Sequence, residues 1–251
     1  MAAPTVTSRA FLLRSVEYGE SDRVVTLLTE ERGRISAIAR GARKSRRRFG
    51  GALEAFSLIE VSLAPSKGSL MRLAEASLIE ANGGLARSLD RIEGASLLLG
   101  LLRELLPEDQ PEPGAFALLD EALPLLARAG PEECRRLSAA AAMRALALAG
   151  VGVGAARCNA CGRPVPPRRP VHFDPRRGGV ICTPCGGGPH LLSAGAAAGL
   201  RELQSAPLDR VGGAPAGGEA MDEIEAALDQ FVHYQIDRPQ QPLSRKRNRQ
   251  R

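Results

Sequence analysis

The stretch AFLLRSVEYGESDRVVTLLTEERGRISAIARGA, residues 10–42, decides the fold of the amino-terminal part of the chain. Its apolar runs are short and are separated by Gly, Ser and Asp, a pattern that predicts β-strands joined by turns. The tetrapeptide Glu-Arg-Gly-Arg at 31–34 fits a hairpin turn in which Gly33 takes a positive φ. For DRVVTLLTEE at 22–31, a helix is the alternative to a strand.

Two more runs, FSLIEVSLAPSKGS at 56–69 and LMRLAEASLIEA at 70–81, bring the expected number of strands to five between Ser8 and Glu80. A sheet of this size can close into a small barrel, which leaves no free edge. OB-type barrels bind oligonucleotides on one face and its adjoining loops. We therefore predict an α+β multidomain protein in which residues 1–80 form an OB-fold β-barrel that binds nucleic acid.

Residues 81–157 and 191–236 are predicted to form a helical domain, because Leu and Ala recur there at helical spacing. Proline and glycine residues divide the first segment into about three helices, and residues 219–236 form one more amphipathic helix. GVGVG at 150–154 has no strand before it and no helix starting on it. We interpret it as a helix terminator and flexible joint and not as a phosphate loop.

Two pairs of cysteines, CNAC at 158–161 and CTPC at 182–185, give the strongest chemical signal. Two residues between cysteines let both sulfur atoms of a tight turn face one ion, and two such turns complete a tetrahedron. We predict a zinc ribbon at 158–190 that holds a structural Zn²⁺ ion through Cys158, Cys161, Cys182 and Cys185. The alternatives are two redox motifs, which normally begin a helix beside a βαβ pattern absent here, or accidental spacing in a loop. His172 and His190 are surplus to four thiolates and are expected to be surface residues.

A basic segment, ARGARKSRRRFGGAL at 39–53, follows the third predicted strand and has no acid between Glu31 and Glu54. A loop between barrel strands is exposed and can contact a phosphate backbone. A solubilising loop is the alternative, but such loops usually mix charges of both signs. Tyr18 and Phe49 are the only aromatic residues near this face, so recognition should be mainly electrostatic. The predicted DNA-binding residues are Arg40, Arg43, Lys44, Arg46, Arg47 and Arg48.

The distribution of charge also indicates a polyanionic partner. The chain carries 34 Lys and Arg against 28 Asp and Glu, a formal net charge of +6. The excess lies in three basic islands, residues 1–80, 157–190 and 237–251, which are separated by two acidic helical stretches. Clustered positive charge favours nucleic acid, whereas evenly spread charge mostly aids solubility. The last island, 237–251, is predicted to be a disordered tail, and whether the ribbon also contacts phosphate stays open.

Several classes of function find no support in the sequence. The amino terminus lacks a charged region followed by an apolar core, and no segment is apolar for long enough to span a membrane, so we expect a cytoplasmic protein without a membrane partner. There is no G-x-S-x-G, no Walker loop and no H-E-x-x-H, so we expect no enzyme. Two rivals to a DNA-binding role remain. One is an RNA-binding or ribosome-associated zinc-ribbon adaptor, and the other is a nucleic-acid-modifying enzyme with an unrecognised site.

Three segments carry a resemblance to a known family: IARGARKSRRRFGGALEAF at 38–56, LLLGLLRELLPEDQP at 97–111 and ALALAGVGVGAARCNACGRP at 145–164. With the second cysteine pair, they resemble the bacterial RecO recombination-mediator family from about residue 8 to residue 236. The resemblance implies an OB-fold, a central helical domain and a zinc module placed against it. The basic run LSRKRNRQR at 243–251 is not part of this pattern.

The same resemblance implies a function and partners. A member of this family binds single- and double-stranded DNA and anneals complementary strands. It works with RecR to load RecA onto DNA coated by single-stranded DNA-binding protein, whose acidic, apolar tail docks on the helical domain. Nucleoid association would follow from DNA binding. Some members lack the cysteines, so here the metal prediction depends on the four that this chain contains.

Overall fold

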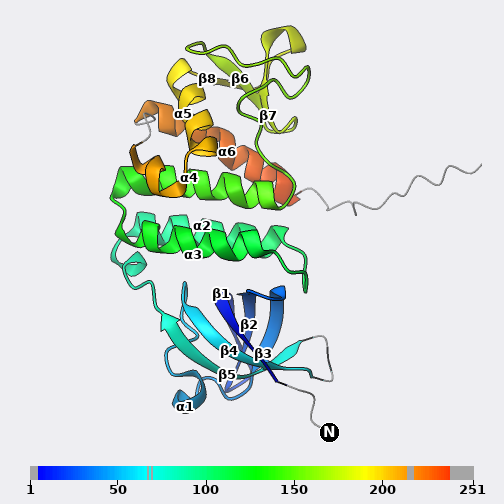
Figure 1. Cartoon of the computed structure of the whole chain (residues 1–251), viewed down its shortest axis with the longest axis vertical. Helices are drawn as coiled ribbons and strands as arrows, with labels where there is room; N and C mark the ends of the chain where they lie inside the picture. Colours follow the sequence, from blue (N-terminus) through cyan, green and yellow to red (C-terminus); the bar gives the residue numbers. More distant parts are fainter. Residues whose placement is uncertain (1–4, 67, 69, 214–217, 238–251) are drawn as a thin grey trace, which may run out of the picture.

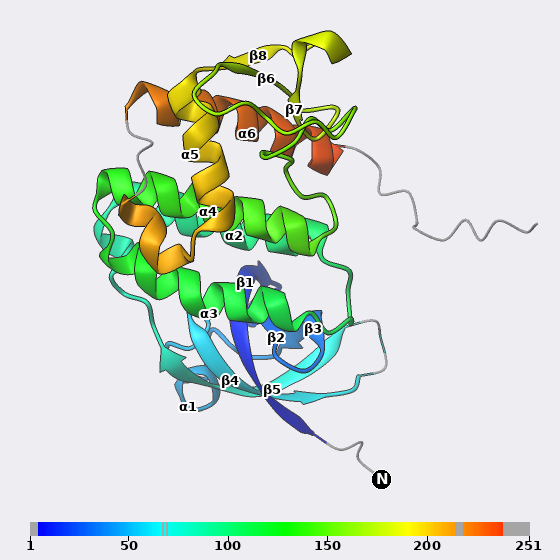
Figure 2. The same cartoon turned by 45° about the horizontal axis from the view of Figure 1, so that its top comes forward.

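The computed structural model describes residues 5–66, 68, 70–213 and 218–237 of the chain. Three regions follow one another along the long axis of the molecule: a β-barrel, a stack of helices, and a small sheet with its loops (Figure 1). The small sheet lies at the opposite end from the barrel in both views (Figures 1 and 2).

The amino-terminal region is a closed five-stranded barrel with the strand order β1-β2-β3-β5-β4. All of its strand pairs are antiparallel except β3 with β5, which closes the barrel in parallel. The predicted OB-type barrel is confirmed, and DRVVTLLTEE contributes a strand and not a helix. The strands are β1 Val6–Tyr18, β2 Asp22–Thr29, β3 Gly33–Ala39, β4 Leu58–Ala64 and β5 Met71–Glu80.

Alternation of buried and exposed side chains explains why these residues form strands. In β3, Ile35, Ala37 and Ala39 point into the barrel and their neighbours are partly exposed. Strand β1 differs because the side chains in its middle are buried on both faces of the sheet. Leu12 enters the barrel core, whereas Phe11 belongs to the core shared with the helices and stacks on Phe116 with ring centroids 5.0 Å apart. The barrel is therefore packed firmly against the helical region.

The helical region contains the expected helices between residues 85 and 148 and at the carboxyl end, together with one helix that lies within the predicted helical segment 191–236 but whose bounds the sequence did not give. That helix, α5, lies across α4 (Figure 2). Prolines begin two of the helices, at Pro113 and Pro131, where the missing N–H costs nothing. The helices are α2 Leu89–Leu105, α3 Pro113–Arg128, α4 Pro131–Leu148, α5 Ala194–Ser205 and α6 Glu219–Asp237, with 3-10 turns η1 Leu85–Arg87 and η3 Leu208–Gly213.

The glycine-rich segment at 150–154 ends α4, as predicted, with Gly150 at φ +78°. Its far end is anchored and is not a free joint. The Gly154 N–H donates to the Gly178 carbonyl at 2.9 Å, and the Val180 N–H donates to the Gly154 carbonyl at 2.8 Å. The chain thereby enters the small sheet already hydrogen-bonded to it.

The small sheet has the order β7-β6-β8 and is built from β6 Val171–Asp174, β7 Gly179–Ile181 and β8 His190–Leu192. It shares a core with the last helix, because Phe173 meets Phe231 of α6 edge-on at 6.4 Å between ring centroids. Helix α6 includes Asp237, so the first residue of the segment assigned to a disordered tail is helical. The rest of that prediction, residues 238–251, lies outside the described residues.

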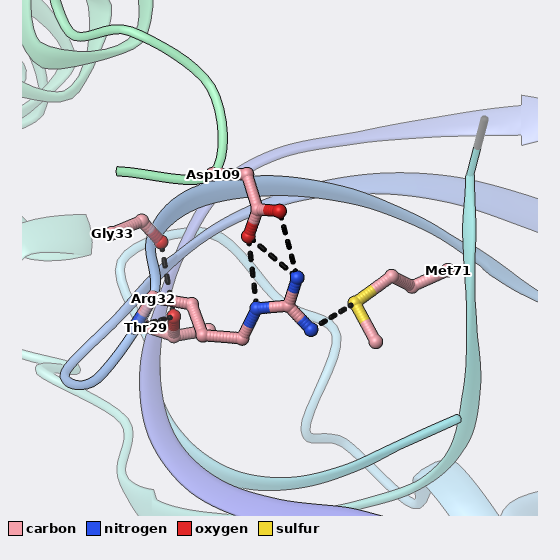
Figure 3. A network of polar contacts seen from close by, with 5 residues as sticks. All are labelled: Thr29, Arg32, Gly33, Met71 and Asp109. Atoms are coloured by element: carbon pink, nitrogen blue, oxygen red, sulfur yellow. Dashed lines mark hydrogen bonds and ion pairs between the residues drawn. The ribbon is translucent and has the colours of Figure 1, made fainter. Parts of the chain in front are cut away.

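The β2–β3 turn locks the barrel to the segment between α2 and α3 (Figure 3). The Arg32 guanidinium donates to both carboxylate oxygens of Asp109, with Nε–Oδ1 and Nη2–Oδ2 both 2.8 Å. The Asp109 N–H donates to the Arg34 carbonyl at 2.7 Å, and Arg34 Nε donates to the Leu106 carbonyl at 2.8 Å. Because backbone and side chain both take part, the hairpin tip has one docked position.

Substituting Gly33 by Ala is expected to destabilise the protein by about 2–4 kcal/mol. Gly33 has φ +69°, where a side chain is strained, and an added Cβ would lie 1.7 Å from the Gln110 carbonyl oxygen, so the docked hairpin must move. Denaturant unfolding measures the loss. The control is Asp109→Asn, which breaks an exposed ion pair at a residue with φ +56° that Asn tolerates and should cost less than about 1 kcal/mol. Equal losses in the two variants would show that the contact at Gly33 is not tight.

Candidate metal centre and nucleic-acid interface

The structure brings the two cysteine pairs together. Cys158 and Cys161 lie in a turn that follows α4. Cys182 directly precedes the 3-10 helix η2, Thr183–Cys185, and Cys185 is the last residue of that helix. Their four Sγ atoms all lie within 4.8 Å of one another. Four cysteines this close can hold a metal ion.

Local hydrogen bonds shape both turns. The Gly162 N–H donates to the Cys158 carbonyl at 2.8 Å, and the Cys185 N–H donates to the Cys182 carbonyl at 2.9 Å. Each pair is followed by a glycine with positive φ, Gly162 at +74° and Gly186 at +96°. This Cys-x-x-Cys-Gly repetition was present in the sequence and would have strengthened the metal prediction, since the turn needs a left-handed residue there.

The sulfur geometry fits a tetrahedral tetrathiolate site. Sulfur atoms about 2.3 Å from a central zinc ion are about 3.8 Å apart, whereas a disulfide needs about 2.05 Å. The Cys161 and Cys182 sulfurs are 3.7 Å apart, and all four thiols are free. Neither pair begins an α-helix, as a redox motif normally does, so the redox alternative loses its structural context.

The protonation of the thiols also indicates a cation. Hydrogen bonds from backbone N–H groups, that of Cys182 above all, lower the pKa of the Cys158 thiol to about 6. Hydrogen bonds with the Cys182 and Cys161 thiols raise the pKa of the Cys185 thiol to about 12. The Cys158 thiol thus favours the thiolate form, while the Cys185 thiol donates its proton to the neighbouring sulfur atoms and resists losing it. A divalent cation would remove that conflict.

The flanking histidines are engaged elsewhere. The His172 ring Nδ1 is 3.0 Å from the Gly188 carbonyl oxygen, and the His190 Nε2 is 2.9 Å from the Gln230 Oε1. Neither belongs to the group of four sulfur atoms. Four thiolate ligands would fill a tetrahedral metal centre and leave no open position for substrate or water.

The six basic residues of the 40–48 segment form what we call the basic rim: Arg40, Arg43, Lys44, Arg46, Arg47 and Arg48. The segment leaves β3 at Ala39 and includes a single helical turn, α1 Arg46–Phe49, where the sequence predicted only loop. In both views α1 lies at the end of the barrel remote from the helices (Figures 1 and 2). All of these side chains are exposed except that of Arg48, which is partly buried.

Anchors on the barrel hold the rim in place. Asp22 Oδ1 accepts from the Gly41 N–H at 2.8 Å, and the Ser21 carbonyl accepts from the Arg43 N–H at 3.0 Å. Phe49 is 3% exposed and packs in the barrel core, so it is not available to stack on bases. Arg48 braces the segment, donating to the Arg40 carbonyl at 2.8 Å with its guanidinium 5.0 Å from the centre of the Phe49 ring.

The remaining rim cations differ in their freedom. Arg43 forms an ion pair with Glu17 at 3.4 Å. Within the described part of the chain, the other four make no ion pair: Arg40, Lys44, Arg46 and Arg47. Tyr18, at the β1–β2 turn that supports Arg43, is 60% exposed and is the aromatic side chain open to solvent beside the rim. Four cations that make no ion pair with a described residue and one exposed ring therefore lie on neighbouring segments of the barrel.

Comparison with known proteins matches nearly the whole chain. Residues 1–82 match the family described as Recombination protein O N terminal, and residues 86–244 match Recombination protein O C terminal. The chain belongs to the RecO family. The boundary between the two RecO regions falls where β5 ends and the helical region begins. Of the run 243–251 that was placed outside the RecO pattern, Arg245 to Arg251 lie beyond the match, whereas Leu243 and Ser244 lie within it.

Curated relatives bear the name DNA repair protein RecO. That of Anaeromyxobacter sp. (strain Fw109-5) is 43% identical over 229 residues, which cover 88% of this chain and 89% of the relative. That of Myxococcus xanthus is 41% identical over 179 residues, which cover 70% of this chain and 71% of the relative. That of Desulfatibacillum aliphaticivorans is 33% identical over 248 residues, which cover 96% of this chain and 95% of the relative. Membership in RecO places the chain in DNA repair and recombination. Among the residues that the structure describes, no helix is both long and apolar enough to cross a membrane.

Proposed function

We propose that this RecO-family chain is a DNA-binding recombination mediator that holds single- and double-stranded DNA on the basic rim. The observation that supports this most directly is the set of four cations at the end of a closed barrel without an ion-pair partner among the described residues, Arg40, Lys44, Arg46 and Arg47. Fixed cations release condensed counterions from a phosphate backbone on contact, which favours binding whatever the base sequence.

The chemistry of the rim suits strand annealing. With Phe49 buried in the core, the rim offers phosphate contacts and little base stacking beyond Tyr18. Such a surface has little sequence preference and accepts both strand states. A protein that anneals complementary strands has to hold a strand as its pairing state changes, and an electrostatic grip allows this. We propose that the chain acts in this way without catalysing a covalent reaction, in the cytoplasm and in association with the nucleoid.

Family membership supports proposed partners: RecR, single-stranded DNA-binding protein and, indirectly, RecA. We propose that the chain helps to load RecA onto DNA coated by single-stranded DNA-binding protein and that docking uses the helical region. A cavity of about 340 Å³ between α2, α4 and α6 is a poor match to an acidic tail. Arg135 is the one cation in its lining and already pairs with Glu225 at 2.7 Å, and acids such as Asp90 and Glu93 also line it. We therefore assign no docking residues.

We further propose that the metal is zinc and that it serves the fold. Four thiolate donors in a closed tetrahedral arrangement are typical of structural zinc, which supplies no redox chemistry. When bound, the ion would hold the 158–161 turn to η2, and through β6 it would stiffen the sheet that packs on α6.

An annealing assay tests the proposed function. At low salt, the chain is expected to accelerate the pairing of complementary DNA strands by roughly tenfold or more. This acceleration should disappear as salt rises, because phosphate neutralisation drives it. Fluorescence quenching between labelled complementary strands measures the rate. Preference for structured RNA over both DNA forms would support an RNA-binding adaptor instead, and turnover of a nucleic-acid substrate would contradict the non-catalytic role.

A further inference from the structure

A cleft of about 410 Å³ opens where the barrel meets α2. Its lining comes from β1 between Leu12 and Glu17, from Arg23 of β2, from the segment between Leu53 and Phe56, and from the face of α2 between Ser96 and Arg103. It shares no residue with the rim, but the chain leads from α1 into its 53–56 wall. In addition, Glu17 of the cleft is the partner of Arg43 of the rim at 3.4 Å.

Arginines from three separate elements line this cleft. The side chain of Arg14 on β1 makes no hydrogen bond or ion pair with any residue in the described part of the chain. Arg23 of β2 donates through Nη1 to the Leu53 carbonyl at 3.1 Å, and Arg103 of α2 is 2.8 Å from the carboxylate of its own neighbour, Glu104. Two acids, Glu17 and Glu54, also belong to the lining, but Glu17 is compensated by Arg43. The cleft therefore carries a positive excess beside a basic surface.

The walls of the cleft are built to leave it open. A bulge between Leu12 and Arg14 interrupts the pairing of β1 with β2. Phe56 lines the cleft with φ +67°, a conformation that non-glycine residues rarely adopt. On α2, Ser96 and Gly100 are one turn apart and face the cleft with little or no side chain, and a Cβ added at Gly100 would meet nothing within 4 Å. The space is bounded by an aromatic ring and by guanidinium groups.

We propose that this cleft binds one nucleotide of single-stranded DNA, as a continuation of the strand held on the basic rim. This inference rests on the proposed function, because the rim must deliver the strand. Guanidinium groups bind phosphate oxygens in a fixed fork, and an unpaired base can stack on an aromatic ring such as that of Phe56. A base within a duplex is paired and stacked, so it cannot enter a cleft without leaving the helix.

The two surfaces would then divide the work between them. The rim binds phosphate in single and double strands alike, whereas the cleft adds affinity for single strands alone. When a complementary strand pairs with the bound one, the nucleotide leaves the cleft and that added affinity is lost. An annealing protein with such a cleft binds its substrate more tightly than its product, which favours release of the duplex.

Filling the cleft without changing its charge tests this inference. Gly100→Phe occupies open space and replaces glycine in a helix by a better helix former, so the fold should tolerate it. Affinity for a single-stranded oligonucleotide is expected to fall about 5- to 100-fold, the range for loss of one stacked base, and affinity for the matching duplex by less than about twofold. Fluorescence anisotropy with labelled DNA measures both. Ala117→Phe, on the exposed face of α3, is the control and should leave both affinities unchanged.

A second variant examines the cations. Arg14→Ala combined with Arg103→Ala should reduce the salt dependence of single-strand binding by about 1.4 in log-log slope, if each arginine contacts one phosphate. Equal losses for single strand and duplex, or no loss in either variant, would overturn the inference. If neither cleft variant loses affinity but neutralising the rim lowers the affinity for both single strand and duplex, the inference fails and the proposed function still holds. If neutralising the rim also had no effect, the proposed function would fail together with the inference.

Discussion

Replacing Cys158 with Ser is expected to release the bound metal and to lower the melting temperature by about 6–12 °C, equivalent to about 3 kcal/mol or more of stability. Cys158 is 2% exposed, and its sulfur accepts the Cys182 N–H at 3.3 Å, so it joins the two turns even before a metal is considered. Serine is a poor zinc ligand, and three remaining thiolates hold the ion less tightly. Metal analysis and thermal unfolding of the purified protein measure the two effects.

Cys134 provides the matched control. It is the one cysteine of the sequence outside the two pairs, and it is buried in α4. Its Sγ is 3.3 Å from the Asp90 carbonyl oxygen, and burial raises the pKa of its thiol. Cys134→Ala should retain one metal ion per chain. Because the ribbon lies at the opposite end of the molecule from the rim (Figure 1), Cys158→Ser should reduce DNA affinity far less than it reduces stability. Retention of one metal ion and of the full melting temperature in Cys158→Ser would show that the ligand set is wrong.

The barrel could be predicted because its information is local. Short apolar runs with turn residues between them specify five strands, and Gly33 marks the turn between β2 and β3 in the sequence and takes the expected positive φ, +69°, in the structure. The ambiguous run at 22–31 could not be decided locally. It becomes a strand because β1 and β3 pair with it on either side and because Leu27 then enters the barrel core.

Helix α5 shows where local information ends. Its sequence, AGAAAGLRELQS, contains two glycines that weaken a helix by themselves. Tertiary contacts stabilise this helix where its intrinsic helix propensity is weak, because Ala197, Leu200 and Leu203 are buried and α5 packs on α4. Ser193 also caps the helix, accepting from the Ala196 N–H at 3.1 Å. The sequence therefore placed this segment in the helical domain but did not give the bounds of a helix that its neighbours stabilise.

The same contrast separates the two candidate DNA surfaces. The rim was visible in the sequence because its cations are contiguous, and the metal site because its ligands come in spaced pairs. The cleft was not visible, because Arg14 and Arg103 are far apart in the sequence and only the docking of β1 on α2 brings them to one space. The sequence also could not separate Arg48, which braces α1, from Arg46 and Arg47, which make no ion pair with any described residue.

Neutralising three rim arginines, Arg40, Arg46 and Arg47, to Ala should weaken single-strand binding roughly 50-fold at about 0.15 M salt. If each arginine neutralises one phosphate, the log-log salt slope should become shallower by about 2.1 for single strands and about 2.7 for duplex. Arg48 is left in place because its contacts hold the segment together. The replaced side chains are exposed, so the melting temperature should change by less than about 2 °C.

The control for this variant removes the same number of charges elsewhere. Arg87, Arg128 and Arg210 are exposed and form no ion pair within the described part of the chain, so replacing them by Ala changes the net charge equally. If binding depends on total charge, both triple variants will lose affinity alike, and the rim has no special role. If it depends on cations fixed at the end of the barrel, only the rim variant will lose affinity. Its loss should then be the same for oligonucleotides of different sequence, because phosphate contacts carry no base information.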